Sequence, residues 1–212
     1  MADGLRLDTL EIRLGGRCMV ALDAHVAPGE VLTVMGPSGS GKSTLLAAIT
    51  GALDPAFALS GRILLDGEDV TALPTERRRI GILFQDELLF PHLSVGGNLA
   101  FGLTPSLRGR AARRKRIDSA LQQIGLEGFA SRDPATLSGG QKARVALMRT
   151  LLADPRALLL DEPFSRLDAA RRGQIRELVF ARAKAQRLPV LLVTHDREDA
   201  CAAGGAVIEL GA

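Results

Sequence analysis

The sequence contains no tryptophan and no tyrosine, and aromatic residues make up only 3% of its 212 residues. Because 46% of the residues are nonetheless apolar, the interior must be built from leucine, alanine, valine and isoleucine. The formal net charge is only +3, which argues against a dedicated nucleic-acid-binding protein. A length of 212 residues suffices for one large domain with a sizeable core.

Cysteine is equally scarce, since Cys18 and Cys201 are the only two and lie far apart with no metal-ligand spacing. We expect both to be reduced, buried thiols of a cytoplasmic protein. The apolar runs fall well short of the ~18 residues that a membrane-spanning helix requires. The first residues also lack the basic and apolar parts of a signal peptide. We therefore expect a chain that works at a membrane only through a partner.

The most informative stretch fits the phosphate-binding loop pattern G-x-x-x-x-G-K-[ST]. Its residues are Gly36, Pro37, Ser38, Gly39, Ser40, Gly41, Lys42, Ser43 and Thr44. An apolar run over 31–35 predicts a buried strand before the loop, and a helix is expected after it, from Ser43 to Thr50. The glycines let successive N–H groups point at phosphate oxygens, and the helix start adds its positive dipole end. Lys42 is expected at the β- and γ-phosphates and Ser43 on Mg²⁺, so the loop predicts nucleoside triphosphate binding.

The pattern of strands and helices predicts an α/β fold with a mainly parallel core sheet and an antiparallel β subdomain. Alternating apolar residues predict one antiparallel pair over 10–26 and another around the Asp66-Gly67 turn. Buried strands are expected over 80–85, 157–160, 189–193 and 206–209, and helices over 108–124, 141–152 and 168–185. Gly125 should end the first of these helices. We expect one domain over 1–212, in which a helical subdomain (87–155) is inserted into an α/β core (1–86 and 156–212).

Two further motifs carry charged or small polar residues. Asp161 and Glu162 follow an apolar strand, which would place Asp161 on Mg²⁺ beside the phosphate loop and Glu162 on the attacking water as general base. The segment Leu137–Gln141 opens a helix with Ser138, Gly139, Gly140 and Gln141. Such a helix start predicts a second anion site.

These motifs, with Gln85 and His195, occur in the order seen in ATP-binding cassette (ABC) ATPases, and the sequence resembles their nucleotide-binding subunit over its whole length. Leu137–Gln141 resembles the family's signature motif. Residues 165–168 resemble its D-loop, with Arg166 where alanine is usual, and residues 194–196 resemble its switch-histidine loop. The fold expected from the resemblance is the P-loop NTPase fold of the ABC type.

The resemblance implies a mechanism that the residues alone do not. Two subunits pair head to tail, and each ATP lies between the phosphate loop of one and the segment Ser138–Gln141 of the other. Lys42 binds phosphates, Ser43, Asp161 and Gln85 serve Mg²⁺, Glu162 is the base, and His195 holds the γ-phosphate and Glu162 in register. ATP closes this homodimer and hydrolysis reopens it, because loss of the γ-phosphate removes the contact that favours the closed state.

One position departs from the family. An aromatic residue usually stacks on adenine about 23 positions before the loop, whereas here Arg13 stands near that position and the first aromatic residue is Phe57. Either the Arg13 guanidinium stacks on the base, or Arg13 is simply exposed.

Three functions fit an ABC ATPase. The segment Gln85–Val95 is similar to the corresponding segment of importer ATPases for thiamine, ferric iron, sulfate and polyamines, where this segment docks the permease. Leu89, Phe90 and Leu93 would form the apolar surface patch that contacts the permease. The resemblance favours import over the alternative of an exporter or lipoprotein-release ATPase. A non-transport ABC protein acting on DNA or ribosomes would carry coiled-coil insertions or a second cassette, which the sequence lacks. The basic tract over 108–116 contains no aromatic residues and is interpreted as a solvated helix face, so no nucleic acid is expected.

The expected importer contains this homodimer, integral permease subunits and, indirectly, an extracytoplasmic solute-binding protein. The ATPase subunit would then lie peripherally on the cytoplasmic face of the inner membrane. The chain ends shortly after the last expected strand, so we expect no additional C-terminal β domain. Thiamine-type importer ATPases are similarly short, which makes a thiamine-like solute the cargo that the resemblance favours.

Overall fold

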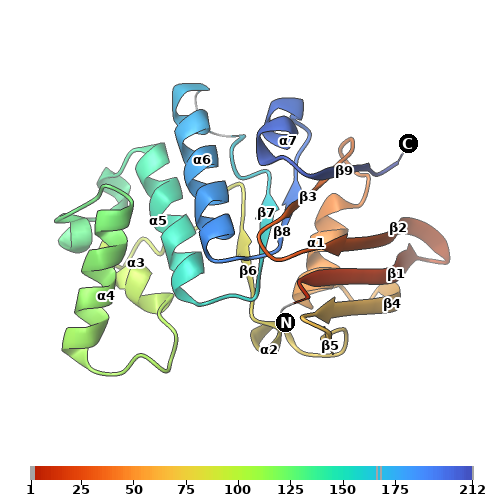
Figure 1. Cartoon of the computed structure of the whole chain (residues 1–212), viewed down its shortest axis with the longest axis horizontal. Helices are drawn as coiled ribbons and strands as arrows, with labels where there is room; N and C mark the ends of the chain where they lie inside the picture. The colour runs from red at the N-terminus through yellow and green to blue at the C-terminus, as the bar shows by residue number, and fades with distance from the viewer. Residues whose placement is uncertain (1–2, 166, 168, 212) are drawn as a thin grey trace. The chain divides into compact units, whose positions relative to one another are not determined.

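A computed structural model describes residues 3–165, 167 and 169–211, which form two compact units. Unit 1 comprises 1–82, 156–162 and 180–212, and unit 2 comprises 83–155 and 163–179. The elements over the first half of the chain are β1 (Leu5–Leu14), β2 (Arg17–Val26), β3 (Val31–Met35), α1 (Lys42–Thr50), β4 (Phe57–Leu65), β5 (Glu68–Asp69), α2 (Thr75–Arg78), β6 (Ile80–Leu83) and α3 (Val95–Phe101) (Figure 1). Those that follow are α4 (Arg110–Gln123), the 3₁₀ turns η1 (Phe129–Ser131) and η2 (Pro134–Thr136), α5 (Gly139–Leu152), β7 (Ala157–Asp161), α6 (Ala169–Ala185), β8 (Val190–Val193), α7 (Arg197–Ala203) and β9 (Ala206–Glu209).

The first sheet of unit 1 is antiparallel, with strand order β2-β1-β4-β5. Apolar residues alternate along β1 and β2, so one face is buried, and Leu10 pairs with Leu22 in the register. Asp66 and Gly67 both have positive φ, which is the conformation that a tight hairpin between β4 and β5 requires. Both predicted antiparallel pairs are thereby confirmed.

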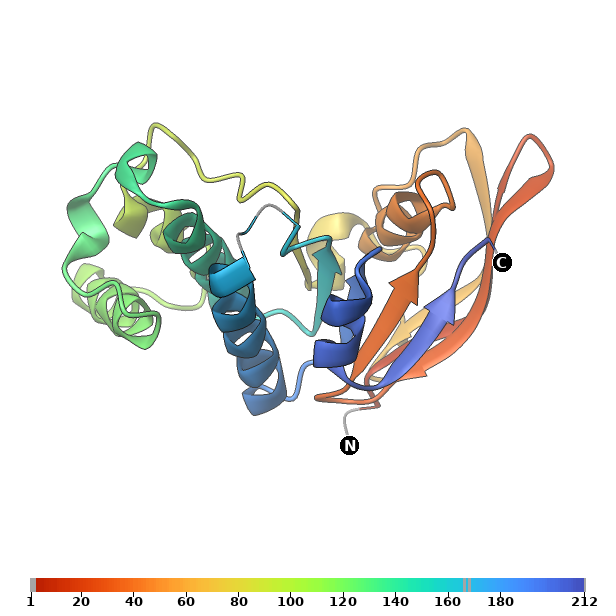
Figure 2. The same ribbon diagram turned by 90° about the horizontal axis from the view of Figure 1, so that it is seen from above.

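The second sheet has strand order β6-β7-β8-β3-β9, and its pairs β3–β8, β3–β9 and β7–β8 are parallel. Figure 2 shows β3 and β9 side by side in this sheet. The strands β7 and β8 are continuous apolar runs whose leucines and valines are fully buried, as expected when both faces of a parallel sheet are covered. The α/β fold class is confirmed, and the carboxyl ends of β3, β7 and β8 share one edge.

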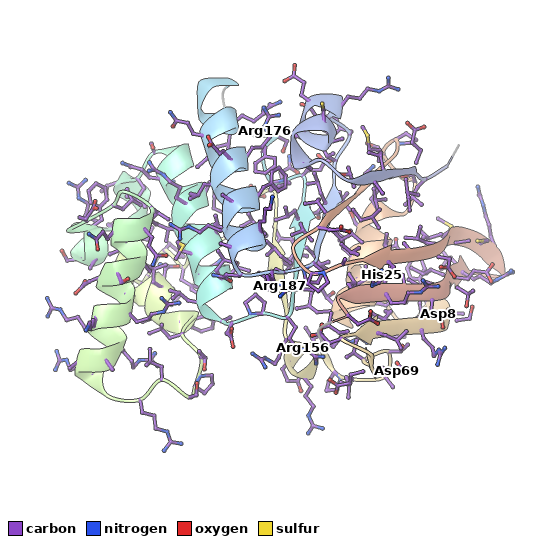
Figure 3. The ribbon with its side chains drawn as sticks, in the orientation of Figure 1. Asp8, His25, Asp69, Arg156, Arg176 and Arg187 are labelled. Atoms are coloured by element: carbon purple, nitrogen blue, oxygen red, sulfur yellow. The ribbon has the colours of Figure 1, made fainter. Side chains whose placement is uncertain are left out.

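The core of unit 1 joins both sheets through α1. Leu45 and Ile49 of α1 are buried in one cluster with residues of the antiparallel sheet and with Leu159 and Leu191 of the parallel sheet. Arg156, labelled in Figure 3, ties the start of β7 to the β4–β5 hairpin. Its guanidinium donates to the Leu65 carbonyl at 2.6 Å and pairs with Asp66 and Glu68 at 3.5 and 2.6 Å.

Over 95–152 the regular elements of unit 2 are all helices or 3₁₀ turns, and α3 packs on α4, α5 and η1. Ala120 and Leu121 of α4 and Ile124 just after it are buried, whereas Ile117 is half-buried. As predicted, Gly125 follows the helix end with φ of 64°, while its N–H and that of Leu126 donate to the last-turn carbonyls of Gln122 and Leu121. Unit 2 also includes residues 163–179, and the helical subdomain expected over 87–155 stays a prediction.

Two expectations were wrong. Cys18 and Cys201 are free thiols but are exposed, because Cys18 lies in the exposed first residues of β2, where the register with β1 shifts, and Cys201 lies in the exposed part of α7. The strand expected over 80–85 ends at Leu83, so Gln85 lies in an irregular bend after it. The D-loop residues Arg166 and Asp168 lie outside the described residues. Within the part of the chain that is described, no helix combines the length and apolar character needed to cross a membrane.

Candidate functional site

The phosphate loop connects β3 to α1 in unit 1, as the sequence predicts. Gly41, the N-cap of α1, has φ of 91°, and a Cβ atom there would lie 2.5 Å from Val20 Cγ2 of β2. A Cβ atom on Gly36 would lie 2.6 Å from Ser40 Oγ and 2.7 Å from the Leu210 carbonyl oxygen. The two glycines are therefore required by backbone conformation and by close packing, so that larger residues would distort the loop.

Lys42 is the first residue of α1, and its side chain is buried. Its Nζ donates to the carbonyl oxygens of Gly36 and Pro37 at 2.7 and 2.8 Å. A lysine ammonium has three donors. These two bonds hold the ammonium against the loop while its third donor remains for an anion.

The start of α1 is electropositive and open. Among the described residues, no side chain caps it, and its first turn holds no acidic residue. By contrast, Ser138 caps α5 and Asp196 caps α7. The free N–H groups and the helix dipole at this end of α1 suit a phosphate group.

Asp161 and Glu162 stand where β7 ends at the shared edge of the parallel sheet. Asp161 pairs with Val193 of β8, and the Glu162 N–H donates to the Val193 carbonyl at 2.9 Å. Glu162 has φ of 45°, a left-handed conformation that is uncommon for a residue with a side chain. Its Oε1 lies 3.0 Å from His195 Nδ1, so the carboxylate and the imidazole predicted to act together are in contact.

His195 is held by the backbone at the end of β8. The buried Thr194 donates its N–H to the Val34 carbonyl at 3.2 Å, and its hydroxyl accepts from the Asp196 N–H at 3.0 Å. The imidazole itself is largely exposed, with 63% of its side chain accessible. It can therefore contact Glu162 on one side and a bound group on the other.

A cavity of about 260 Å³ joins the loop to the two acids. Its lining residues are Met19, Ser38, Gly39, Gly41, Lys42, Ser43, Thr44, Asp161 and Glu162. Among the described residues, no group of three or more His, Cys, Asp or Glu side chains forms a ready metal site. Mg²⁺ does not need one, because it takes one or two protein oxygens and completes its shell with phosphate oxygens and water. The Ser43 hydroxyl and the Asp161 carboxylate fit that requirement.

The electrostatics of Asp161 follow from its position. Burial raises the pKa of its carboxyl group, the neighbouring Glu162 charge raises it further, and the Lys42 ammonium opposes both effects. A cation bound beside Asp161 would stabilise the charged carboxylate and lower this pKa, which is the behaviour expected of a metal ligand.

We predict that Asp161→Asn raises the melting temperature of the nucleotide-free protein at pH 7 while abolishing Mg²⁺-dependent hydrolysis. Since the folded pKa lies above the unfolded value, ionising Asp161 costs folding free energy, and this cost grows as the pH rises through the folded pKa. Removing the charge should therefore raise the melting temperature, and at this chain length each 1 kcal/mol of added stability corresponds to roughly 2–4 °C. Thermal denaturation at several pH values checks this, because the difference should vanish below about pH 4. An unchanged or lower melting temperature at pH 7 would contradict it.

Gln85 and the segment Ser138–Gln141, also predicted as site residues, belong to unit 2. Gln85 is exposed in unit 2. Ser138 and Gln141 form a reciprocal cap at the start of α5, where the Ser138 N–H donates to Gln141 Oε1 at 2.9 Å and the Gln141 N–H to Ser138 Oγ at 3.4 Å. Ser138 and Gly139 are exposed, whereas Gly140 is buried. The contributions of these residues to a nucleotide site stay predictions.

Arg13 lies in β1 near the β1–β2 turn, and its guanidinium donates to the Gly16 carbonyl at 3.0 Å and pairs with Glu11 at 2.7 Å. Sequence reasoning did not identify Met19, which lines the phosphate cavity from β2. It also missed Arg197 and Glu209, which line a second cavity of about 330 Å³ with Gly36 and His195. None of these three residues belongs to a local motif, since the fold alone brings them to the loop.

Comparison with known proteins places this geometry in a family. A family model described as ABC transporter matches residues 20–165. The chain is 52% identical over 183 residues to the uncharacterized ABC transporter ATP-binding protein YnjD of Escherichia coli (strain K12), covering 86% of this chain and 84% of that protein. It is 48% identical over 196 residues to the thiamine import ATP-binding protein ThiQ of Cereibacter sphaeroides, and the match covers 92% of this chain and 83% of that protein. The solved structure of cbiO1 from Clostridium perfringens, described as part of the ABC transporter complex cbiONQ, matches with a TM-score of 0.86 at 31% identity, covering 99% of this chain and 85% of that one.

Proposed function

The chain belongs to the ABC transporter family as an ATP-binding, ATP-hydrolysing subunit, and on that basis we propose that it powers the import of a small solute. The observation that carries the proposal is the cavity in which the phosphate loop meets Asp161 and Glu162, with His195 in contact with Glu162. The resemblance stated from the sequence is thereby confirmed at the level of the family.

The side chains divide the work of hydrolysis. Lys42 and the N–H groups at the start of α1 bind the β- and γ-phosphates. Glu162 accepts the proton of the attacking water, and His195 orients the Glu162 carboxylate and contacts the γ-phosphate. Ser43, Asp161 and Gln85 would hold Mg²⁺, which would supply positive charge to offset that of the phosphates.

The active form is a head-to-tail homodimer. In each half, the phosphate loop of one subunit binds ATP, and Ser138, Gly139, Gly140 and Gln141 of the other subunit contact its γ-phosphate. Support comes from the exposed start of α5, where the Ser138 side chain caps only the Gln141 N–H and so leaves the earlier N–H groups and the helix dipole to an anion. ATP closes the dimer because it binds both faces, and hydrolysis removes that shared contact.

The membrane partner docks on the segment Gln85–Val95. Leu88 is 57% exposed there, and Phe101, whose ring contacts Phe90, is 69% exposed. Exposed apolar residues gathered on one surface favour a protein partner. Leu89, Phe90 and Leu93 are only half-buried, so they can contribute both to the patch and to the packing beneath it. The partner is an integral permease, which places the subunit peripherally on the cytoplasmic face of the membrane.

Import of a thiamine-like solute is the specific form of the proposal. It is supported by the 48% identity to an ATPase named for thiamine import. An extracytoplasmic solute-binding protein would deliver the solute to the permease, so the cargo is chosen by chains other than this one.

The proposal is tested by co-purification from the native host. Tagged Glu162→Gln protein is expressed, membranes are solubilised gently with ATP present, and the co-purifying chains are identified. We expect a multi-span membrane protein together with a secreted solute-binding protein whose ligand is thiamine-like. A membrane partner without a binding protein would indicate export instead, and recovery of nucleic acid or ribosomes without a membrane partner would overturn the transport function.

A separate prediction concerns the base. With Arg13 bonded to Glu11 and Gly16 and no aromatic residue before Phe57, base discrimination should be weak. We expect dissociation constants for ATP and GTP within about tenfold, a difference of no more than about 1.4 kcal/mol. Calorimetric titration of wild type and Arg13→Ala with both nucleotides measures this. A strong ATP preference in the wild type would refute the prediction, and equal affinities in both variants would show that Arg13 does not contact the base.

A further inference from the structure

The residues 87–93, here named the docking segment, have no regular secondary structure, although they carry the exposed Leu88. Within the segment, the Leu93 N–H donates to the Phe90 carbonyl at 3.2 Å. A surface that must fit a partner needs a defined shape. Side chains from α3 and α5 supply it.

Asn98 of α3 holds the middle and the end of the docking segment. The side chain is completely buried. Its Oδ1 accepts from the Phe90 N–H at 2.8 Å, while its Nδ2 donates to the carbonyls of Phe90, Leu93 and Ser94 at 3.1, 3.3 and 3.1 Å. The Asn98 side chain thus forms hydrogen bonds with backbone groups of the docking segment that are not bonded within a helix or strand.

Arg149 of α5 holds the beginning of the segment. One terminal nitrogen of its guanidinium donates to the Leu88 carbonyl at 2.9 Å and to Asn98 Oδ1 at 3.4 Å, and the other donates to the Glu87 carbonyl at 3.2 Å. The guanidinium carbon also lies 5.1 Å from the centre of the Phe90 ring. Arginine and asparagine therefore form one connected cluster around the docking segment.

Two features indicate that this cluster is more than packing. Burial lowers the pKa of Arg149, and the oxygens that its guanidinium contacts belong to neutral groups, so keeping the charge there is unfavourable. Leu88 has φ of 45°, a left-handed conformation that a leucine rarely adopts and that needs support from its surroundings. The bond from Arg149 to the Leu88 carbonyl supplies that support at an exposed residue of the segment.

The same helix links the docking segment to the nucleotide. α5 begins after Ser138 and carries Arg149 near its other end. At 1.5 Å per residue, the 14 residues of α5 span about 21 Å as one rigid element. Any displacement of the Ser138 end is therefore carried by the helix to the carbonyls of Glu87 and Leu88.

We propose that Arg149 is a positioning residue that, with Asn98, fixes the docking segment in the shape a permease recognises and couples it to the helix bearing Ser138. This inference rests on the proposed function, because it assumes that a permease docks on this segment. It requires the planar fork of arginine, since lysine offers a single ammonium that cannot hold both carbonyls and Asn98 in the same geometry.

The test compares Arg149→Lys with Arg144→Lys. Arg144 is a matched control, because it lies on the same helix, is also half-buried, and donates to the carbonyls of Gly140 and Ile124 at 3.3 and 2.7 Å. Each substitution is made with Glu162 intact for ATP hydrolysis, and in the Glu162→Gln background for capture of the permease from solubilised membranes. Hydrogen exchange of residues 87–94 is measured on the purified chain.

We expect Arg149→Lys to capture about tenfold less permease, a loss typical of coupling between sites, while its ATP hydrolysis without permease stays within about twofold of wild type. Exchange over residues 87–94 should accelerate in this variant alone. The control should match the wild type in all three measurements. Equal capture by Arg149→Lys and wild type, or equal losses in both variants, would overturn the inference.

The failure of the two proposals can be told apart. If the wild type captures no permease, the proposed function fails, and the positioning role is then judged by exchange alone. Unchanged exchange over residues 87–94 in Arg149→Lys would overturn it. If Arg149→Lys does not fold, Asn98→Ser replaces it, with the same expected loss of capture and the same control.

Discussion

Glu162→Gln is expected to bind Mg²⁺-ATP with near-normal affinity and to hydrolyse it at least ~10²-fold more slowly, the lower range for loss of a general base. The carboxylate stands at the end of β7, lines the cavity with Lys42, and lies 3.0 Å from His195 Nδ1. An amide has nearly the same shape but cannot accept the proton of an attacking water. Binding should persist because Lys42 and the loop amides contact the phosphates independently of residue 162.

The matched control is Glu177→Gln, an equivalent substitution at an exposed position of α6. Phosphate release under saturating ATP and calorimetric titration separate turnover from binding in both variants. The control should hydrolyse ATP at the wild-type rate. Normal turnover by Glu162→Gln would remove Glu162 from the role of base, whereas a parallel loss of ATP binding would indicate that it serves the nucleotide site structurally.

Lys42→Ala is expected to weaken ATP binding by at least ~10²-fold. A hydrogen bond to a charged group contributes about 1.5–3 kcal/mol, and about 2.8 kcal/mol corresponds to a hundredfold change in affinity. The ammonium is buried and already fixed by Gly36 and Pro37, so it contacts phosphate with little loss of side-chain freedom. Alanine removes both the charge and this preorganisation.

Calorimetric titration is the suitable measurement, since the chain has no tryptophan whose fluorescence could report binding. Lys184→Ala, at an exposed position of α6, is the control and should bind like the wild type. Lys42→Ala should also lose a little stability, because the Gly36 and Pro37 carbonyls lose their partner. Retention of wild-type affinity would show that the loop amides alone bind the phosphates.

Local motifs explain why much of the fold and of the candidate site could be predicted. The phosphate loop needs glycines and lysine at fixed spacing, and the alternation along β1 and β2 shows which face is buried. Asp161 and Glu162 could be placed at the same edge as the loop because parallel strands share their carboxyl ends. The burial expected for Cys18 was wrong: it shares the alternation of the buried Val20 and Leu22, but it lies at the exposed start of β2, where the register with β1 shifts.

The cluster of Arg149 and Asn98 around the docking segment could not be predicted in the same way. Arg149 contacts Asn98 and the Leu88 carbonyl across 51 and 61 residues of sequence, and it lies in a helix whose spacing gives no hint of either contact. Asn98 likewise stands as a single polar residue in an apolar helix. Such contacts depend on how α3 packs on α5, which is a property of the fold and not of a local pattern.

ATP-driven pairing of two copies is tested most directly by the mass of Glu162→Gln in solution, measured by light scattering with and without Mg²⁺-ATP. We expect the 22.4 kDa monomer without nucleotide and a particle of twice that mass with it. Ser138→Arg in the same background should stay monomeric while still binding ATP, since it blocks the contact across the dimer. A Glu162→Gln protein that binds ATP yet keeps the monomer mass at every nucleotide concentration would contradict the central claim that ATP joins two copies of this chain.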